Sequence, residues 1–524
     1  MTIINFLKRK IFILFLFSPI LISFLHSQTF WEARYNGTGN WADYPAAIRL
    51  FPCNYEALVY VTGKSYGDTS YYDFLTIKYN ERGEVLWARR YNSEFNGYDA
   101  ATDLRVDREG NAFVIGYSQV RSGYDFLILK YRADGELLWE KRLNGPGNSD
   151  DLPYCSEIDG EGNFYVAGIS FFDVHRGYDA LLVKYNGEGE TLWTRIFNND
   201  SNGDDIPRAL TIDQEGNIIL ALYSWGGRNN FDYLVLKYDQ NGNLVFQKRF
   251  NGPGNDDDYP AGIATDENRN IYIVGTSYGE NADYWLLKLS PSGETLWTRR
   301  VDRGRDDHAW GIKWTRTWDF ICVTGYSYSP ISGYDILSIC YDENGVERWR
   351  QIYDGGGDDF AFGLTFSSGY LLVTGTTQSN RGDYDYISLF YFGFTGRERF
   401  RHFYDGPAGR NDYGFAATGT DRASYPEYGV AGWSEGRGSY YDYYIACYWN
   451  FIALEERGLH FSQKQDGLTE WTIYDITGRK IKALRELSGK KLEEGKGESF
   501  RNLPSGIYIL KSETGKRKKI IIPK

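Results

Sequence analysis

The chain has 524 residues with a formal net charge of -12, and it is rich in aromatic residues and glycine, with 44 Tyr, 31 Phe, 15 Trp and 59 Gly. Basic residues exceed acidic ones in residues 1–28 and 455–524, so the central segment 29–454 carries the acidic excess. Because binding to a nucleic-acid backbone requires clustered Lys and Arg, this charge distribution excludes nucleic acid as the main partner.

The first 28 residues have the pattern of a secretory signal peptide. Residues 8–10 are Lys-Arg-Lys, and the apolar segment 11–25 follows them. We expect cleavage after Gln28. The apolar segment is short for a membrane span and no second one follows it, so we expect no membrane span after signal removal.

From residue 29 onward the chain repeats a unit of 51 to 56 residues. A large aromatic residue marks the same point of each unit: Trp31, Trp87, Trp139, Trp193, Phe246, Trp297, Trp349 and Phe400. A regular period of this size, filled with short alternating strands, predicts one repeated supersecondary unit arranged in a ring. We interpret the repeated aromatic residues as core residues that fill the space between neighbouring units.

Each unit has the pattern of four strands joined by tight turns. The clearest copy places its strands at residues 99–107, 112–118, 124–131 and 136–142. Its hairpin turns contain Gly, as tight turns require. A recurring Asp-x-x-Gly-Asn turn lacks the full ligand set of an EF-hand, so we assign it to turn chemistry. Four-stranded units arranged radially are the blades of a β-propeller.

The two ends of the repeat array predict how the ring closes. The array begins with a lone fourth strand at residues 31–34, whereas its last unit has three clear strands that end near Trp449. The N-terminal strand is therefore expected to complete the last blade, which leaves no free sheet edge. We predict an all-β fold with a β-propeller of about eight four-stranded blades over residues 29–450.

The motifs (F/V)-x-G-x-S, Tyr-Asp-x-Leu-x-x-Lys-Tyr and Gly-Glu-x-Leu-Trp-x-Arg recur throughout these units. This pattern resembles the bacterial β-propeller repeat family that is often described as seven-bladed. The resemblance covers roughly residues 29–450, although our count of eight departs from the nominal blade number. It implies a surface or secreted protein of a family without an assigned reaction.

After Trp449 the period stops and the composition becomes basic. Residues 474–479 read YDITGR, residues 503–510 read LPSGIYIL, and the end is basic and apolar. Alternation and turn residues predict a small β-sandwich domain over residues 455–524. This segment is similar to the C-terminal sorting domain of the type IX secretion system, which implies passage across an outer membrane and contact with secretion machinery. An immunoglobulin-like stalk module that is never cleaved remains the alternative.

The five cysteines are odd in number and scattered: Cys53, Cys155, Cys322, Cys340 and Cys447. Cys322 and Cys340 fall on neighbouring predicted strands, where a disulfide would be feasible. We nevertheless expect buried free thiols, so cysteine is not expected to hold this fold together.

Two acidic series are predicted on one face of the propeller, because the loops from fourth to first strand and from second to third strand emerge together. The first series precedes the innermost strand: Asp43, Asp99, Asp151, Asp205, Asp258, Asp307, Asp359 and Asp412. The second is the Tyr-Asp series of the third strand: Asp73, Asp125, Asp179, Asp232, Asp283, Asp335, Asp385 and Asp442. Eightfold repetition favours a structural role, in which these Asp residues cap backbone N–H groups.

Departures from the repeat indicate where an asymmetric site would lie. The Lys of the third strand is replaced by Cys340, Phe390 and Cys447 in the last three blades, which also contain unusual Trp and His residues. The candidate binding residues on the acidic and aromatic face are Asp258, Asp307, Asp359, Asp412, Trp310 and Trp433. Such a rim suits a sugar ring or Ca²⁺, but the pattern specifies no metal ligands and we expect no other cofactor.

No catalytic signature stands out. The five His residues are far apart and lack the spacing of metal ligands: His26, His175, His308, His402 and His460. We therefore expect a non-catalytic scaffold, secreted or attached to the outer cell surface, that binds a glycan or a surface protein. The alternative is a carbohydrate-active enzyme, a glycosidase or lyase, that uses two carboxylates of the acidic face.

Overall fold

The structure is a computed structural model that describes residues 29–38, 40–53, 56–173, 175–227, 230–420, 427–448, 471–475, 480–484, 506–512 and 517–522. The expected signal peptide, residues 1–28, lies outside these residues. In the part of the chain that is described, no helix is long and apolar enough to cross a membrane.

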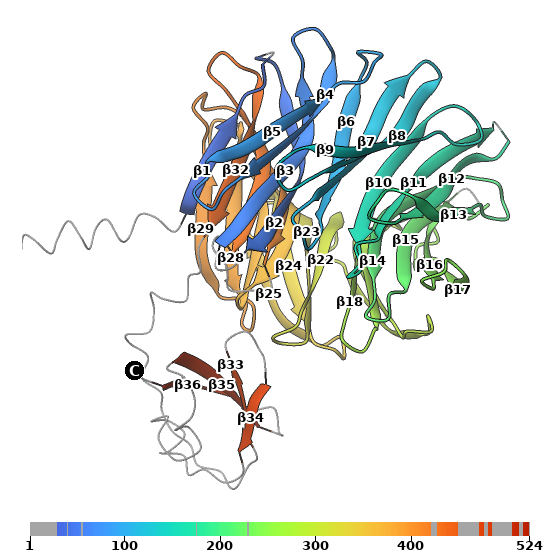
Figure 1. Cartoon of the computed structure of the whole chain (residues 1–524). Helices are drawn as coiled ribbons and strands as arrows, with labels where there is room; N and C mark the ends of the chain where they lie inside the picture. The colour runs from blue at the N-terminus through green and yellow to red at the C-terminus, as the bar shows by residue number, and fades with distance from the viewer. Residues whose placement is uncertain are drawn as a thin grey trace, which may run out of the picture.

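Eight four-stranded antiparallel sheets form the propeller, as predicted, and each is one blade (Figure 1). Blades 1 to 4 comprise β2 (Asp43–Cys53), β3 (Glu56–Tyr66), β4 (Tyr72–Tyr79) and β5 (Val85–Tyr91); β6 (Asp99–Val106), β7 (Ala112–Val120), β8 (Gly123–Tyr131) and β9 (Leu137–Leu143); β10 (Asp151–Ile158), β11 (Phe164–Asp173), β12 (Gly177–Tyr185) and β13 (Thr191–Phe197); β14 (Asp205–Ile212), β15 (Ile218–Trp225), β16 (Phe231–Tyr238) and β17 (Leu244–Phe250). Blades 5 to 8 comprise β18 (Asp258–Thr265), β19 (Ile271–Ser277), β20 (Asp283–Leu289) and β21 (Thr295–Val301); β22 (Asp307–Thr315), β23 (Phe320–Ser329), β24 (Gly333–Tyr341) and β25 (Glu347–Tyr353); β26 (Asp359–Ser367), β27 (Tyr370–Gln378), β28 (Tyr384–Phe392) and β29 (Glu398–Tyr404); β30 (Asp412–Gly419), β31 (Tyr428–Glu435), β32 (Tyr441–Tyr448) and β1 (Thr29–Tyr35).

The hairpin turns form as the sequence predicts. In the turn between β6 and β7, Asp107 Oδ1 accepts hydrogen bonds from the backbone N–H groups of Glu109 and Asn111. Gly110 takes a φ of 82°, which favours glycine. The Asp of this turn thus caps backbone N–H groups, as turn chemistry predicts.

The ring closes through the N-terminal strand, as predicted. β1 pairs with β32 in antiparallel register, and Figure 1 shows β1, in blue, beside β32, in orange. Arg34 of β1 forms an ion pair of 2.5 Å with Asp442 of β32. The innermost strands β2, β6, β10, β14, β18, β22, β26 and β30 each contact the next, and β30 contacts β2. The prediction of eight blades is therefore confirmed.

The repeated aromatic residues join neighbouring blades, which confirms their interpretation as core residues. Trp87 of blade 1 donates its indole N–H to Ala133 O in the last turn of blade 2, at 3.1 Å. Lys78 Nζ donates to the same carbonyl at 2.6 Å. Gly135 of that turn packs on the Trp87 ring so closely that a Cβ atom would lie 2.8 Å from it. Each blade thus bonds to a turn of its neighbour.

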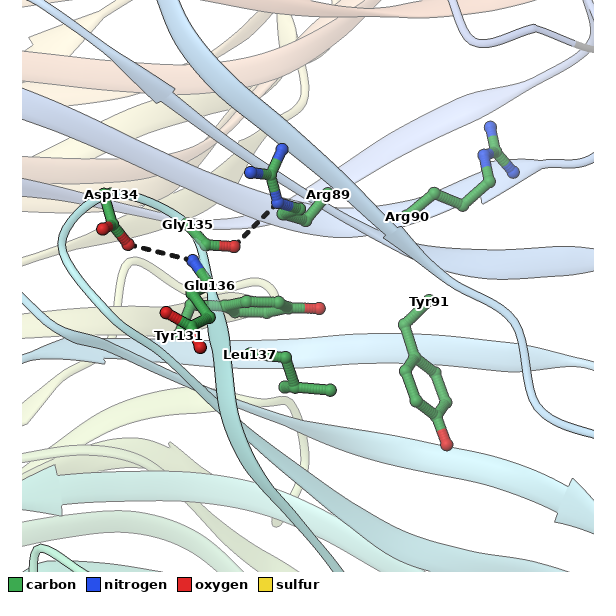
Figure 2. A pocket seen from close by; sticks show the side chains of 8 residues that line it. All are labelled: Arg89, Arg90, Tyr91, Tyr131, Asp134, Gly135, Glu136 and Leu137. Atoms are coloured by element: carbon green, nitrogen blue, oxygen red, sulfur yellow. Dashed lines mark hydrogen bonds between the residues drawn. The ribbon is translucent and has the colours of Figure 1, made fainter.

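A groove of about 570 Å³ runs along the outer edge of this contact (Figure 2). Arg89 spans it, because Arg89 Nε donates to Gly135 O at 2.7 Å. Its lining comes from β5, the end of β8, the turn that follows and the start of β9: Arg89, Arg90, Tyr91, Tyr131, Asp134, Gly135, Glu136 and Leu137. It is the open edge of the contact between blades 1 and 2.

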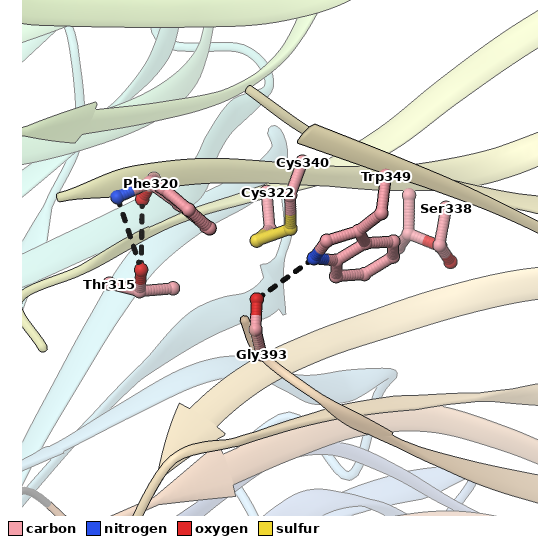
Figure 3. Close-up of a disulfide and its surroundings, with 8 residues drawn as sticks. Thr315, Phe320, Cys322, Ser338, Cys340, Trp349 and Gly393 are labelled. Atoms are coloured by element: carbon pink, nitrogen blue, oxygen red, sulfur yellow. Dashed lines mark hydrogen bonds between the residues drawn. A yellow bond between two sulfur atoms is a disulfide. The ribbon is translucent and has the colours of Figure 1, made fainter. Parts of the chain in front are cut away.

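One expectation about cysteine is wrong. Cys322 of β23 and Cys340 of β24 lie directly opposite each other, with 4.1 Å between their Cα atoms, and they form a disulfide (Figure 3). Residues directly opposite each other on two antiparallel strands have Cβ atoms close enough for their sulfur atoms to form a disulfide. The alternation pattern placed both cysteines on neighbouring strands but did not determine their register. Of the three free thiols, those of Cys155 and Cys447 are buried, whereas that of Cys53 is exposed.

The described C-terminal residues form one antiparallel sheet of four strands in the order β34-β33-β35-β36. These strands are β33 (Trp471–Asp475), β34 (Lys480–Leu484), β35 (Gly506–Ser512) and β36 (Arg517–Ile522). The predicted all-β character is confirmed for these strands. The described residues of this segment form no second sheet, which a sandwich requires, and the rest of the predicted domain 455–524 lies outside the described residues.

Replacing Trp87 by Ala tests the contact between blades. Trp87 is 6% exposed, and its loss removes a large ring and leaves Ala133 O with one donor fewer. We expect the free energy of unfolding to fall by about 3 to 5 kcal/mol in urea denaturation. The matched control is Leu86→Ala on the same strand, where Leu86 is 52% exposed and a change within about 0.5 kcal/mol is expected. Equal effects of the two substitutions would contradict the assigned role.

Candidate functional site

One face of the propeller carries an Asp–Ser–Asp row in each blade, and we call it the Asp face. The row crosses the three inner strands in register, as in Asp258, Ser277 and Asp283 of blade 5. Thr377 takes the place of Ser in blade 7. The loops from fourth to first strand and from second to third strand meet here, as the sequence predicts.

The four predicted Asp residues of this face are buried and bonded to their own loops. Each is at most 1% exposed. Their Oδ2 atoms accept backbone N–H groups at 2.6, 2.8, 2.5 and 2.6 Å, in the pairs Asp258–Gly252, Asp307–Arg303, Asp359–Gly355 and Asp412–Gly406. The same bond recurs in the other four blades, so capping of the loop is their shared structural role.

Burial changes the acidity of these groups. Desolvation raises the pKa of Asp258, Asp359 and Asp412 to about 6, against the hydrogen bonds that favour the ionised form. Asp43 of blade 1 is raised to a pKa of about 6 for the same reason. Because the shift has one cause in blades on all sides of the ring, it does not single out an acid catalyst.

In several blades an Arg side chain forms an ion pair with the Asp of the third strand and offsets its negative charge. Arg90 and Arg249, both on outermost strands, lie 2.8 and 3.0 Å from Asp73 and Asp232. The equivalent position is Ile196, Ile352 or Phe403 in blades 3, 6 and 7. The charge at the junction between blades therefore varies around the ring.

At each of three blade junctions, three carboxylates come together. One oxygen atom of each carboxylate lies within 4.8 Å of one oxygen atom of the other two. They are the sets Asp283, Asp302 and Asp307; Asp335, Asp354 and Asp359; and Asp385, Asp405 and Asp412. All three lie at consecutive blade junctions. Oxygen-only clusters of this composition suit a hard divalent cation. Sequence reasoning missed Asp302, Asp354 and Asp405, which lie in the loops that follow the outermost strands.

The two predicted Trp residues belong to one cluster of rings, which we call the aromatic patch. It consists of Trp310, Phe362, Tyr413, Phe415 and Trp433. Trp310 and Phe362 have ring centroids 5.2 Å apart, as do Phe362 and Phe415. Tyr413 and Trp433 are 4.0 Å apart. None of the five side chains is buried, and Trp310 is 41% exposed.

A repeated β-bulge places three of these rings outside the interblade core. Every innermost strand has a register shift three residues after its Asp. The bulged residue is unpaired and never buried. In chain order these residues are Ala46, Thr102, Tyr154, Arg208, Ala261, Trp310, Phe362 and Phe415. Phe362 and Phe415 were missed from sequence, and aligning this one position across the repeats would have found them.

Comparisons with known proteins support a β-propeller repeat protein. A family model described as Beta-propeller repeat matches residues 247–281. No curated protein is similar in sequence at a significant level. Solved structures with a similar arrangement include dihydro-heme d1 dehydrogenase NirN in complex with DHE, at 13% identity and a TM-score of 0.44, covering 66% of this chain and 64% of NirN.

Two further structures resemble the chain. The WD40 domain of SCAP from fission yeast has 9% identity and a TM-score of 0.42, covering 78% of this chain and 95% of that domain. A europium-containing methanol dehydrogenase has 11% identity and a TM-score of 0.35, covering 80% of this chain and 93% of the enzyme. The chain spans about two thirds of the length of NirN, at 64%. These similarities are too low to bear on its activity.

The raised pKa of Asp258 predicts a pH-dependent stability. The folded pKa, about 6, exceeds the ordinary unfolded value of about 3.9, so the folded state binds the extra proton between these values. This contribution is present below about pH 4 and is lost as the pH rises through 6. We expect Asp258→Asn to gain stability relative to the unchanged protein, by about 2 to 3 kcal/mol between pH 4 and pH 7, in urea denaturation.

The control is Asp239→Asn in an exposed turn. Hydrogen bonds from Asn243 lower the pKa of Asp239, so its stability difference should change with pH in the opposite direction. A difference for Asp258→Asn that stays constant between pH 4 and pH 7 would contradict the assignment.

Proposed function

We propose that this chain is an exported, non-catalytic β-propeller that binds glycans through the aromatic patch. The observation that carries this proposal is the concentration of unburied rings on three consecutive blades. At the bulged position, blades 6, 7 and 8 have Trp310, Phe362 and Phe415, whereas blades 1 and 5 have Ala46 and Ala261. The fold itself accepts alanine there, so the rings serve something other than folding.

The chemistry of the patch suits a sugar. Contiguous aromatic rings offer apolar faces to the C–H groups of pyranose rings, and they cost little conformational entropy on binding. Tyr413, which stacks on Trp433, adds a hydroxyl group to the patch. An exposed apolar patch with a polar rim is typical of a binding surface. A surface protein with exposed aromatic or proline-rich segments would use the same chemistry.

The proposed lack of catalysis is supported by the state of the carboxylates. The predicted Asp residues beside the patch are buried and bonded to backbone N–H groups. A glycosidase requires one accessible carboxyl group that donates a proton and a second that acts as base or nucleophile. Because the capping hydrogen bond recurs in all eight blades, it supports a structural role for these Asp residues.

Export to the outer cell surface is the second part of the proposal. The signal-like residues 1–28 support passage across the inner membrane. The disulfide Cys322–Cys340 fits an oxidising compartment outside the cytosol. The motifs in residues 455–524 that resemble the type IX sorting domain support transport by that machinery, followed by secretion or surface attachment.

Glycan binding is tested with an array of polysaccharides and the mature protein from Thr29. We expect saturable binding that Trp310→Ala and Phe362→Ala each weaken at least about tenfold, as loss of a central aromatic contact does. The control is Phe403→Ala, which removes a 47% exposed ring on the outermost strand of blade 7 and should leave binding unchanged. Binding that survives both patch substitutions would refute the proposal. Release of reducing sugar from any polysaccharide would instead identify the carbohydrate-active enzyme.

Export is tested by deleting residues 455–524 in the cells that make the protein. We expect the shortened protein to accumulate between the two membranes, whereas the full chain reaches the surface or the medium with its N-terminus at Thr29. Fractionation and N-terminal sequencing provide the measurement. Equal surface delivery of both forms would show that the C-terminal segment is a stalk and not a sorting signal.

A further inference from the structure

The residue before the Ser or Thr of each Asp–Ser–Asp row differs from blade to blade. Tyr, Ile, Thr or Trp occupies this position in seven blades, for example Ile169 in blade 3, Thr276 in blade 5 and Trp433 in blade 8. Blade 1 alone has a charged residue there, Lys64 of β3. Because the fold accepts Ile and Thr at this position, folding does not require a cation there.

Lys64 is partly exposed and lies among the rings of three Tyr residues. Its Nζ atom is 5.1, 4.9 and 5.2 Å from the ring centroids of Tyr44, Tyr72 and Tyr98. Burial raises the pKa of Tyr44 and Tyr72 above the ordinary value of about 10, so these phenols stay neutral near pH 7. The rings therefore attract the ammonium group but do not neutralise its charge.

The ammonium group of Lys64 has donors to spare. It donates one hydrogen bond, to the hydroxyl group of Tyr98. An ammonium group has three N–H donors, and the other two have no hydrogen-bond partner among the residues that the structure describes. Two donors and a full positive charge are thus available to a ligand.

The two Asp residues of blade 1 that belong to the Asp face have other partners. Asp43 accepts from the backbone N–H of Gly37 at 2.6 Å. Asp73 forms an ion pair of 2.8 Å with Arg90. In the described part of the chain, Lys64 forms no ion pair with a carboxylate. The positive charge of Lys64 is therefore not assigned to holding the acidic residues of its own blade.

Lys64 and the aromatic patch are neighbours across the seam that closes the ring. Trp433 of the patch occupies in blade 8 the position that Lys64 occupies in blade 1. Tyr44 connects them, because its ring makes an edge contact with Trp433 at a centroid distance of 5.8 Å and lies 5.1 Å from Lys64 Nζ. One aromatic ring thus separates the patch from an unpaired ammonium group.

We propose that Lys64 binds the anionic group of an acidic polysaccharide, a step that rests on the proposed glycan binding by the aromatic patch and names the class of glycan. A carboxylate or sulfate group accepts charge-assisted hydrogen bonds from the two open donors, whereas the hydroxyl groups of a neutral sugar leave the positive charge unpaired. The sugar rings stack on the patch beside it.

The repeated Asp residues do not present their charge to such a ligand. Those of the first series are each at most 1% exposed, and each accepts a hydrogen bond from its own loop. Lys64 is therefore a charged group of the Asp face that a ligand on the patch can contact directly.

The test compares polymers that differ only in charge: polygalacturonate with its methyl ester, and dextran sulfate with dextran. Calorimetry with the mature protein from Thr29 should show at least about tenfold tighter binding of the charged member in one pair, and that pair identifies carboxylate or sulfate as the anionic group. Lys64→Gln keeps the three Tyr rings and should lower the affinity for the charged polymer to that of the neutral one. Lys64→Arg keeps the charge and should retain the preference.

The matched control is Arg208→Gln, which removes one exposed positive charge from the innermost strand of blade 4, where no residue of the patch lies. It should leave the preference unchanged, and thermal unfolding of each variant shows that the propeller is folded. Equal binding of charged and neutral polymers by the unchanged protein would overturn this assignment and leave glycan binding intact. A preference that survives Lys64→Gln, or that Arg208→Gln removes as well, would also overturn it. No binding of any of the four polymers would overturn both proposals.

Discussion

The pairing of β1 with β32 is the constraint on which the rest of the structure depends. It joins Arg34 to Asp442 across 408 positions of the chain. Glu32 of β1 also pairs with His402 of blade 7, at 3.0 Å. One core cluster includes residues of blade 1, such as Ile48, and residues of blade 8, such as Ile445, with Trp31 packed against it. Each blade has two apolar faces, and only a closed ring covers both faces of every blade.

Closure divides the residues into those that every blade must repeat and those that are free to differ. The capping Asp, the cross-strand Ser or Thr and the interblade aromatic residue recur because every junction has the same geometry. The bulged residue of the innermost strand and the residue after the outermost strand lie outside the core. Their identity changes in the last three blades, at Trp310 and Phe362 for the first position and at Asp354 for the second. The blades therefore differ from one another at positions that do not pack in the core.

The sequence sufficed to predict the blades, their number and the closing strand, because period and alternation report directly on strands and on which faces are buried. It also predicted that Trp87 and its equivalents lie between blades, and that the Asp series caps loops. It identified Trp310 and Trp433 but missed Phe362 and Phe415 of the aromatic patch, because a one-residue bulge decides whether Phe362 packs inward or stays accessible, and alternation does not show a bulge. The Cys322–Cys340 disulfide likewise depends on the strand register. The sequence placed the two cysteines on neighbouring strands but did not show that they lie directly opposite each other.

The last three blades also replace the polar contact that the earlier blades use between neighbours. In blades 1 to 5 a Lys of the third strand donates to a carbonyl of the next blade, as Lys78 does to Ala133 O. Cys340 occupies this position in blade 6, bonded to Cys322 within a core cluster that contains Trp349. Trp349 keeps the indole hydrogen bond to the next blade, to Gly393 O at 2.8 Å. The disulfide lies within blade 6, between β23 and β24, so the contact of this blade with the next consists of apolar side chains and the hydrogen bond of Trp349. Packing between blades 6 and 7 is therefore provided by their shared core and by one indole hydrogen bond, and not by the charged groups of the Asp face.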